Sequence, residues 1–152
     1  MSRRILILNG PNLNLLGTRE PELYGTQTLV QIEELAIKHA RKHNLVAECR
    51  QSNNEAELIG WIQQSRGKCG GIIINAAAYT HTSIAILDAL KAVGLPVVEV
   101  HLTDPKKREP FRHHSFVELA ASATFAGMGS DGYLRALDFL AEKLGPDPVP
   151  SR

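Results

Sequence analysis

Short apolar runs alternate with amphipathic stretches five times along this chain, and this alternation limits its fold more than any other feature. Continuous runs such as Ile5–Leu8 and Gly71–Asn75 are typical of strands that are covered on both faces. The strands expected from such runs are 5–8, 46–50, 71–75, 97–102 and 122–126. The expected helices are 28–40, 55–66, 82–93 and 131–144, with a short one near 116–120.

Strands that alternate with helices in this way predict an α/β fold, in which helices cover both faces of a parallel sheet through right-handed crossovers. Five strands favour the flavodoxin-like order, a three-layer sandwich around a five-stranded parallel sheet. A chain of 152 residues fits one domain with a sizeable core. We therefore expect a single domain over residues 1–145 and a C-terminal tail over 146–152.

Composition excludes several classes of protein. The formal net charge of +1 gives no bulk attraction to nucleic acid or to an anionic membrane, and the apolar stretches are too short to span a bilayer. Cys49 and Cys69 match neither a metal-binding spacing nor a disulfide scaffold. The segment MSRRILILNGPN has no small-residue cleavage pattern and is interpreted as a first strand, not a signal peptide. We expect a reduced, cytoplasmic, enzyme-sized domain.

Sheets of this kind bind ligands at the carboxyl ends of their strands, which directs attention to the residues that follow each run. These segments are 9–12, 51–54, 75–81 and the residues from 101 onward. Amide and hydroxyl groups dominate the first three segments. The sequence therefore predicts a site that hydrogen-bonds a polar, uncharged or hydroxylated molecule.

Glu99 and His101 form the sharpest local pattern, in the strand VVEVHL. Residues two apart on a strand share a face, and a lone carboxylate among apolar residues is costly, so His101 is the expected partner of Glu99. A carboxylate that orients an imidazole is the usual arrangement for a histidine acid or base. The alternative is a structural ion pair at a strand end.

A polar crossover, LTDPKKREPFRHHS, follows that strand. Arg108 and Arg112 are candidates to bind a carboxylate or another fixed polar group, whereas the neighbouring lysines suit a solvated loop. His113 and His114 lack a third ligand at a recognisable spacing, so we expect no metal there. His81, just before the helix 82–93, is either a donor at the mouth of the sheet or an ordinary surface histidine.

The loop GTREPELYG, residues 17–25, places Arg19 near Tyr24 without any apolar period. A tyrosine acts as a base only as the phenolate, and ionising it near pH 7 requires about three pKa units, roughly 4 kcal/mol. One arginine about 4 Å away supplies on the order of 4 kcal/mol before desolvation is subtracted, so Arg19 together with Arg108 makes the phenolate plausible. The alternative is a disordered surface loop.

Taken together, these segments resemble the type II 3-dehydroquinate dehydratases over nearly the whole chain. The matching blocks are LNGPNLNLLGTREPELYG, QSNNEAELIGWI, IIINAAAYTHTSIAILDAL, VVEVHL and REPFRHHS, with Gly127, Gly129, Gly132 and Tyr133 in the last part. The resemblance implies a flavodoxin-like subunit that assembles as trimers into a homododecamer. It also implies reversible loss of water from 3-dehydroquinate, with no metal, cofactor or covalent Schiff base.

The resemblance further implies a role for each matching residue. Tyr24 would be the base, Arg19 and Arg108 would lower its pKa, and His101, oriented by Glu99, would protonate the leaving hydroxyl. The remaining implied site residues are Asn12 at the enolate oxygen, Asn75, Leu102 and Thr103 at the substrate carboxylate, His81 and Arg112 at the ring hydroxyls, and Asp88 in the site of a neighbouring subunit.

Some positions depart from the family pattern. Ala76 and Ala77 stand where Pro-Gly is common, and Asp104 stands where asparagine is usual. Asp104 would weaken substrate affinity or pair with Lys106 or Lys107.

Three rival functions remain on the same fold. A flavin or phosphate binder lacks a GxGxxG motif, and a phosphoacceptor domain lacks acidic residues where Asn9 and Asn75 end their strands. A purely structural assembly protein would leave Glu99 and His101 without a role.

Overall fold

The computed structural model describes residues 2–18 and 20–148, except for the side chains of Leu23 and Tyr24. Five parallel strands form one sheet in the order β2-β1-β3-β4-β5, which is the predicted flavodoxin-like order. The strands are β1 (Arg4–Asn9), β2 (Val46–Gln51), β3 (Gly71–Asn75), β4 (Val97–His101) and β5 (Ala123–Ala126). Each overlaps an expected strand closely, and β4 ends one residue earlier than expected.

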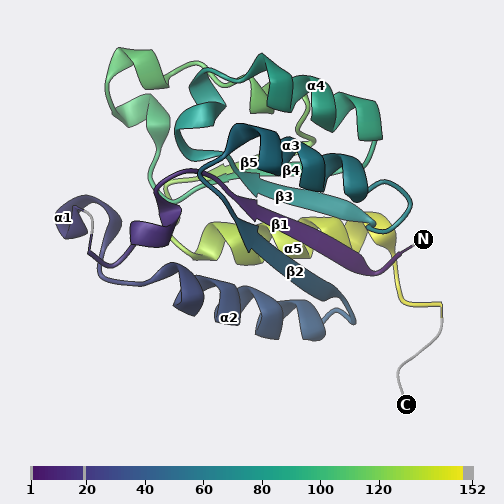
Figure 1. The fold of residues 1–152 in the computed structure, drawn as a ribbon. Helices are drawn as coiled ribbons and strands as arrows, with labels where there is room; N and C mark the ends of the chain where they lie inside the picture. Colours follow the sequence, from purple (N-terminus) through teal and green to yellow (C-terminus); the bar gives the residue numbers. More distant parts are fainter. Residues whose placement is uncertain (1, 19, 149–152) are drawn as a thin grey trace.

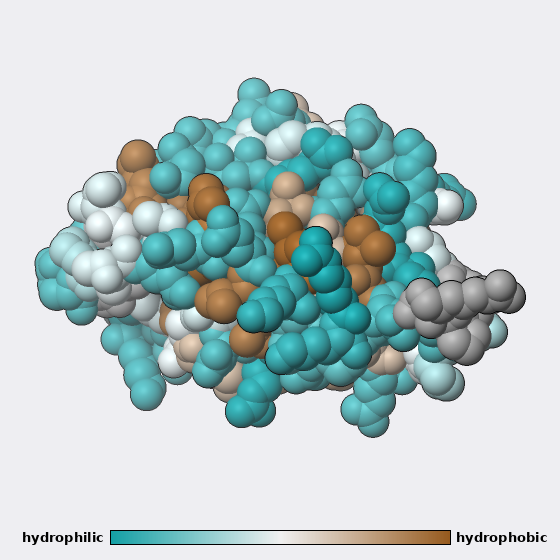
Figure 2. Space-filling model, turned by 90° about the horizontal axis from the view of Figure 1, so that it is seen from below, coloured by the Kyte–Doolittle hydropathy of each residue, from teal (hydrophilic) through white to brown (hydrophobic). Residues whose placement is uncertain are grey.

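Helices cover both faces of this sheet. Figure 1 shows α2 and α5 below the sheet and α3 and α4 above it. The helices are α1 (Pro21–Tyr24), α2 (Leu29–Arg41), α3 (Glu55–Gln64), α4 (Ile84–Val93) and α5 (Asp131–Leu144). Seen from below, hydrophilic side chains cover most of the molecule, and hydrophobic ones show in smaller areas between them (Figure 2). Among the described residues, none of the helices combines the length and apolar character that crossing a bilayer requires.

The strands divide their side chains between two cores. In β1, Ile5 and Ile7 pack into the core between the sheet and α2 and α5, whereas Leu6 and Leu8 pack into the core between the sheet and α3 and α4. All four are at most 3% exposed. This alternation follows from the two-residue period of a strand and explains why the runs are apolar throughout.

Polar side chains fix where the helices begin. The predicted capping box is present: Thr28 Oγ1 accepts from the Gln31 backbone N–H at 3.2 Å, and Gln31 Oε1 accepts from the Thr28 N–H at 2.9 Å. Of the two candidate caps before α4, Ser83 has this role, because its hydroxyl accepts from the Ile86 N–H at 2.9 Å.

Short helical turns occupy segments that the sequence leaves as loops. The GTREPELYG loop contains α1, which lies between Gly17 (φ 93°) and Gly25 (φ 77°). Further 3-10 turns are Leu13–Leu15, Ala77–His81, Pro105–Lys107, Pro110–Arg112 and Val117–Leu119, the last in place of the expected helix near 116–120. Turns of this length have no apolar period, so periodicity does not reveal them. Residues 149–152 of the expected tail lie outside the described part of the chain.

Ala77 adopts a left-handed backbone conformation, with φ of 51°. The family resemblance noted from the sequence implies glycine at this position. The Ala77 N–H donates to Asn75 Oδ1 at 3.2 Å, which holds the turn after β3. A Cβ in this conformation lies too close to the following carbonyl oxygen, so the turn carries strain that glycine would not.

Replacing Ala77 by glycine should therefore raise the free energy of unfolding. Relief of roughly 1–2 kcal/mol of left-handed strain is partly offset by the greater freedom of glycine in the unfolded chain, which leaves a net gain of about 0.5–1 kcal/mol. Urea denaturation measures this gain as a higher midpoint at an unchanged m-value. Ala78→Gly, at the exposed neighbouring position, is the matched control and should lower the midpoint. Equal losses in both variants would refute the strain at residue 77.

Candidate active site

A cavity of about 120 Å³ opens at the carboxyl edge of the sheet, between the loops that follow β1, β3 and β4. Eight of the residues singled out from the sequence line it: Asn12, Asn75, His81, His101, Leu102, Thr103, Arg108 and Arg112. The remaining wall is largely apolar and includes Leu13, Leu16 and Pro105, none of which the sequence analysis selected. Segments as far apart in sequence as Asn12 and Arg112 thus meet where the fold predicts a ligand site.

One wall of the cavity depends on a close approach between the loops after β1 and β3. The Gly10 N–H donates to the Asn75 carbonyl oxygen at 2.8 Å, and a Cβ at Gly10 would lie 2.4 Å from the carbonyl oxygen of Ala76. Glycine is therefore required here. Asn12 follows in a left-handed conformation, and its N–H donates to Asn53 Oδ1 at 2.9 Å, which sets its place on the cavity wall.

Glu99 and His101 form the predicted pair. His101 Nε2 lies 2.6 Å from Glu99 Oε2, and the two residues are 8% and 1% exposed. The Glu99 carboxylate also accepts from Ser115 Oγ at 2.6 Å and from Thr124 Oγ1 at 3.1 Å. Burial raises the pKa of Glu99, but these three hydrogen bonds and the nearby imidazole outweigh burial and hold the pKa below its ordinary value.

This arrangement determines what His101 can do. With Nε2 directed at a carboxylate that stays ionised, Nδ1 is the ring nitrogen left to exchange a proton with a ligand in the cavity. Ser115 and Thr124 support the pair but were missed from the sequence. Thr124 lies directly opposite Glu99 in the β4–β5 register, a relationship visible only once the strand order is known.

His81 lies on the cavity wall in a defined orientation. Its Nδ1 donates to the His114 carbonyl oxygen at 2.7 Å, so Nε2 remains for a ligand. Burial lowers the pKa of His81, and the nearby His101 and Arg112 act in the same direction. The neutral imidazole can therefore hydrogen-bond a hydroxyl group without adding charge to the site.

Arg108 and Arg112 share one carboxylate that the sequence analysis did not select. Glu109 Oε2 accepts from Arg112 Nε at 2.6 Å, and Glu109 Oε1 lies 3.9 Å from Arg108 Nε. A hydrogen bond from Arg112 lowers the pKa of Glu109, so the carboxylate stays charged between the two guanidinium groups. Its position three residues before Arg112 is the sequence signal that would have indicated the pair.

A chain of hydrogen bonds lies beneath the cavity. Asn75 Nδ2 lies 3.2 Å from the Tyr133 hydroxyl, and that hydroxyl donates to Asn9 Oδ1. Burial raises the pKa of Tyr133 above its ordinary value, so the phenol stays neutral. The network joins β1, β3 and α5, and it fixes the Asn75 side chain in the cavity wall.

Four of the predicted site residues are not among the described residues that line the cavity. Glu99 lies behind His101, and Asp88 is exposed on α4. Arg19 and the side chain of Tyr24 lie outside the described part of the chain, so the predicted Arg–Tyr pairing remains a prediction.

Asp104, which departs from the family pattern, serves as a cap. Its Oδ1 accepts from the Lys106 backbone N–H at 3.0 Å at the start of the Pro105–Lys107 turn. The sequence left two expectations for Asp104, a weakened substrate affinity or a pairing with Lys106 or Lys107. The contact with Lys106 is through its backbone N–H, which needs no ordered side chain.

The fold and the site together define a flavodoxin-like α/β protein with a buried carboxylate–imidazole pair at the carboxyl edge of its sheet. The chain belongs to the class II dehydroquinase family, whose model matches residues 3–141.

Similar proteins agree with this assignment. A 3-dehydroquinate dehydratase of Rhodopseudomonas palustris (strain TIE-1) is 56% identical over 146 residues, which cover 95% of this chain and 97% of the relative. A 3-dehydroquinate dehydratase of Bartonella bacilliformis is 54% identical over 144 residues, covering 95% and 91% of the two chains. The type II dehydroquinase structure from Propionibacterium acnes superposes with a TM-score of 0.89 at 44% identity, covering 93% of this chain and 98% of that one.

The support around Glu99 predicts a pH-dependent effect on stability. Because the folded pKa is lowered, the carboxylate contributes stability that is fully present above its unfolded pKa of about 4.5 and is lost as the pH falls through the folded pKa. Thr124→Val removes one donor without changing shape and should lower the free energy of unfolding by about 1 kcal/mol at pH 7 and by less in acid. Urea midpoints across pH measure both effects.

The matched control is Thr82→Val, at an exposed residue whose hydroxyl has no hydrogen-bond partner among the described residues. It should give a small shift that does not vary with pH. A pH-independent loss in Thr124→Val would contradict the assigned support of the Glu99 carboxylate.

Proposed function

We propose that this protein is a type II 3-dehydroquinate dehydratase, which reversibly eliminates water from 3-dehydroquinate to give 3-dehydroshikimate. The observation that carries the proposal is the buried Glu99–His101 pair at the wall of a polar cavity, in a chain whose relatives have that activity in their names. The reaction belongs to the shikimate pathway, which leads to chorismate and the aromatic amino acids.

The elimination needs one base, one acid and a group that stabilises an enolate. Tyr24, as the phenolate, removes a proton from the carbon beside the ketone, and the electron pair moves onto the ketone oxygen as an enolate. The enolate then collapses and expels the hydroxyl on the opposite face of the ring, while His101 supplies the proton that converts this hydroxyl into water. No metal, cofactor or covalent Schiff base enters these steps.

Two arginines, Arg19 and Arg108, would lower the pKa of Tyr24 so that the phenolate can form near pH 7. Arg19 lies five residues before Tyr24, and Arg108 lies on the cavity wall. Each arginine within about 4 Å would favour the phenolate by on the order of 4 kcal/mol, which is comparable with the cost of ionising a tyrosine near pH 7. Asn12 would hold the enolate oxygen through a water molecule, because its backbone is fixed at the rim of the cavity.

The remaining cavity residues would bind the rest of the substrate. Asn75, with the backbone of Leu102 and the Thr103 hydroxyl, suits the substrate carboxylate, because all three residues line the cavity and offer hydrogen-bond donors. His81 and Arg112 suit the ring hydroxyls. For His81 the support is specific, since its Nδ1 is already occupied by a carbonyl and its Nε2 can accept from a hydroxyl.

The assembly that we propose is a homododecamer, a tetramer of trimers, located in the cytoplasm. Asp88 is exposed on α4 and lines no part of its own chain's cavity, which is the placement needed for a residue that completes a neighbouring subunit's site. Within a trimer its carboxylate would reach the ring-hydroxyl end of the neighbouring substrate.

Ultraviolet absorbance tests the activity directly. The product contains an enone within the ring, so its formation from 3-dehydroquinate should increase the absorbance at neutral pH. The activity should persist after dialysis against a chelator, because no step uses a metal. Purified protein that leaves the absorbance unchanged would refute the proposed function.

Tyr24→Phe should abolish turnover without unfolding the protein, because it removes the ionisable oxygen alone. The loss expected for a missing general base is at least about 10²–10⁴-fold in kcat. Tyr79→Phe is the matched control: its hydroxyl donates to the Asn53 carbonyl oxygen at 2.7 Å and does not line the cavity, so most turnover should remain. Near-normal turnover in Tyr24→Phe would exclude Tyr24 as the base.

A further inference from the structure

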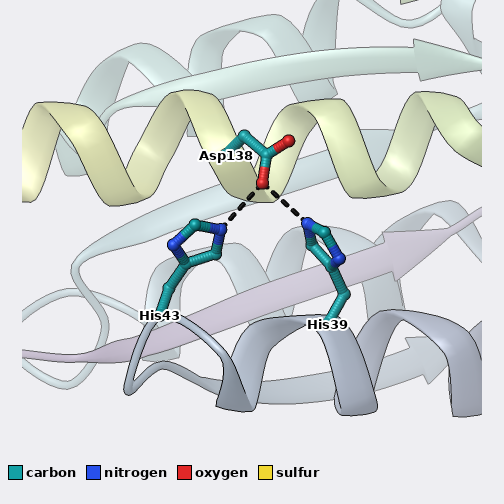
Figure 3. Close-up of side chains that lie close together, drawn as sticks. All are labelled: His39, His43 and Asp138. Carbon is teal, nitrogen blue, oxygen red and sulfur yellow. Dashed lines mark hydrogen bonds and ion pairs between the residues drawn. The ribbon is translucent and has the colours of Figure 1, made fainter.

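His39, His43 and Asp138 form a cluster that the proposed reaction does not use. Among the described residues they are the group whose imidazole and carboxylate atoms converge closely enough for a metal ion, with all ligand atoms within 4.8 Å of one another. Figure 3 shows both imidazole rings directed at the same carboxylate, across the gap between two helices. The residues come from α2, from the turn that follows it, and from the middle of α5.

Short contacts define the geometry of the cluster. His39 Nε2 lies 2.6 Å from Asp138 Oδ1, and His43 Nε2 lies 2.7 Å from the same oxygen. The two imidazole rings stand edge to face, with centroids 5.4 Å apart. Burial raises the pKa of Asp138, but the two histidine hydrogen bonds outweigh burial and lower it, so the carboxylate is ionised at neutral pH.

Neighbouring bonds hold the ligands in place before any ion binds. The Arg3 guanidinium donates to the carbonyl oxygens of His43 at 2.6 Å, Asn44 at 3.3 Å and Gly145 at 2.8 Å. One side chain thus ties the turn that carries His43 to the end of α5. The helices α2 and α5 also pack against each other in the same hydrophobic core. The cluster therefore lies between two elements whose separation is already set.

The donor set selects a class of ion. Two imidazole nitrogens and one carboxylate oxygen suit Zn²⁺ and the neighbouring divalent transition metals, whereas Mg²⁺ and Ca²⁺ prefer oxygen ligands. Metal–ligand bonds of about 2.0–2.2 Å in a tetrahedron place ligand atoms roughly 3.3–3.6 Å apart, so each contact of 2.6 or 2.7 Å must lengthen by about 0.6–1.0 Å. The side chains of His39, His43 and Asp138 are 21%, 34% and 48% exposed, which leaves room for that movement and for a water as fourth ligand.

We propose that His39, His43 and Asp138 form a surface site for a divalent transition metal ion that links α2 to α5. The ion binds the Nε2 lone pair of each neutral imidazole, whose ring proton is then on Nδ1. A proton that Nε2 carries in the present contact with Asp138 passes to solvent, or through solvent to Nδ1, as the ion enters. The site is separate from the cavity, because the helix α2 ends at the amino edge of the parallel sheet and the cavity lies at the carboxyl edge. This site was not expected from the sequence, in which Cys49, Cys69 and the pair His113–His114 were the metal-ligand candidates and none had a recognisable spacing.

Cobalt titration of the tag-free full chain tests the proposal. Co²⁺ replaces Zn²⁺ in such sites and reports its ligand geometry through visible absorption. We expect saturable binding of one Co²⁺ per chain, displacement by Zn²⁺, and no competition from Mg²⁺. Occupied protein should also melt at a higher temperature, because the ion binds the folded state alone.

Ligand variants locate the binding. His39→Gln, His43→Gln and Asp138→Asn should each weaken Co²⁺ binding by at least about tenfold, the lower end of the loss seen even for supporting partners of metal ligands. His114→Gln is the matched control, since this exposed histidine is outside the cluster, and its affinity for Co²⁺ should not change. His43→Cys retains a ligand and should bind Co²⁺ with a new thiolate charge-transfer band, a positive signal that a merely unfolded variant would not give.

Each result has a definite meaning. Binding that is lost in the ligand variants and kept in the control, with the thiolate band in His43→Cys, supports the site. Absence of saturable Co²⁺ binding by the unaltered chain overturns it, as does equal affinity in the His39→Gln/His43→Gln double variant. Turnover of 3-dehydroquinate is a separate measurement, so failure of the metal site and failure of the proposed function can be distinguished.

Discussion

The structure depends on one constraint: in a parallel sheet buried on both faces, polar side chains are placed at the strand ends, and Glu99, inside β4, is held there by three hydrogen bonds. Strands β1, β3 and β4 are buried along nearly their full length, and every one of them ends in a polar residue, Asn9, Asn75 or His101. Because parallel strands end at the same edge, Asn75, His101 and the loops after the three strands line one cavity, and Asn9 lies beneath it. The polar groups of the cavity are thus brought together by the requirement for an apolar interior.

Much of this could be predicted from the sequence because its signals are local. Apolar runs predicted the strands, and the Thr28–Gln31 pattern predicted the start of a helix. The two-residue spacing of Glu99 and His101 predicted that their side chains lie on the same face of the strand. The contributions of Thr124 could not be predicted, since its contact depends on strand register. The meeting of His39 with Asp138 depends likewise on how α2 packs on α5.

The charges around the cavity are balanced more closely than a basic loop sequence suggests. Glu109 lies between Arg108 and Arg112, and Asp104 is engaged by a backbone N–H. His81 is held neutral by burial. An anionic, hydroxylated substrate would therefore be recognised mainly by hydrogen-bond donors that point into the cavity. A net positive charge of the cavity would contribute less to binding. This agrees with a chain whose formal net charge is only +1.

The contacts of the Glu99 carboxylate determine how the protein should lose activity on heating. Its three partners come from β4, from the loop before the Val117–Leu119 turn, and from the edge strand β5. If the edge strand were to detach, a charged group in the interior would lose a partner, and the imidazole beside it would lose a fixed orientation. Detachment of β5 should therefore abolish activity at once. Heat inactivation should follow the cooperative melting of the sheet, without a partly active intermediate.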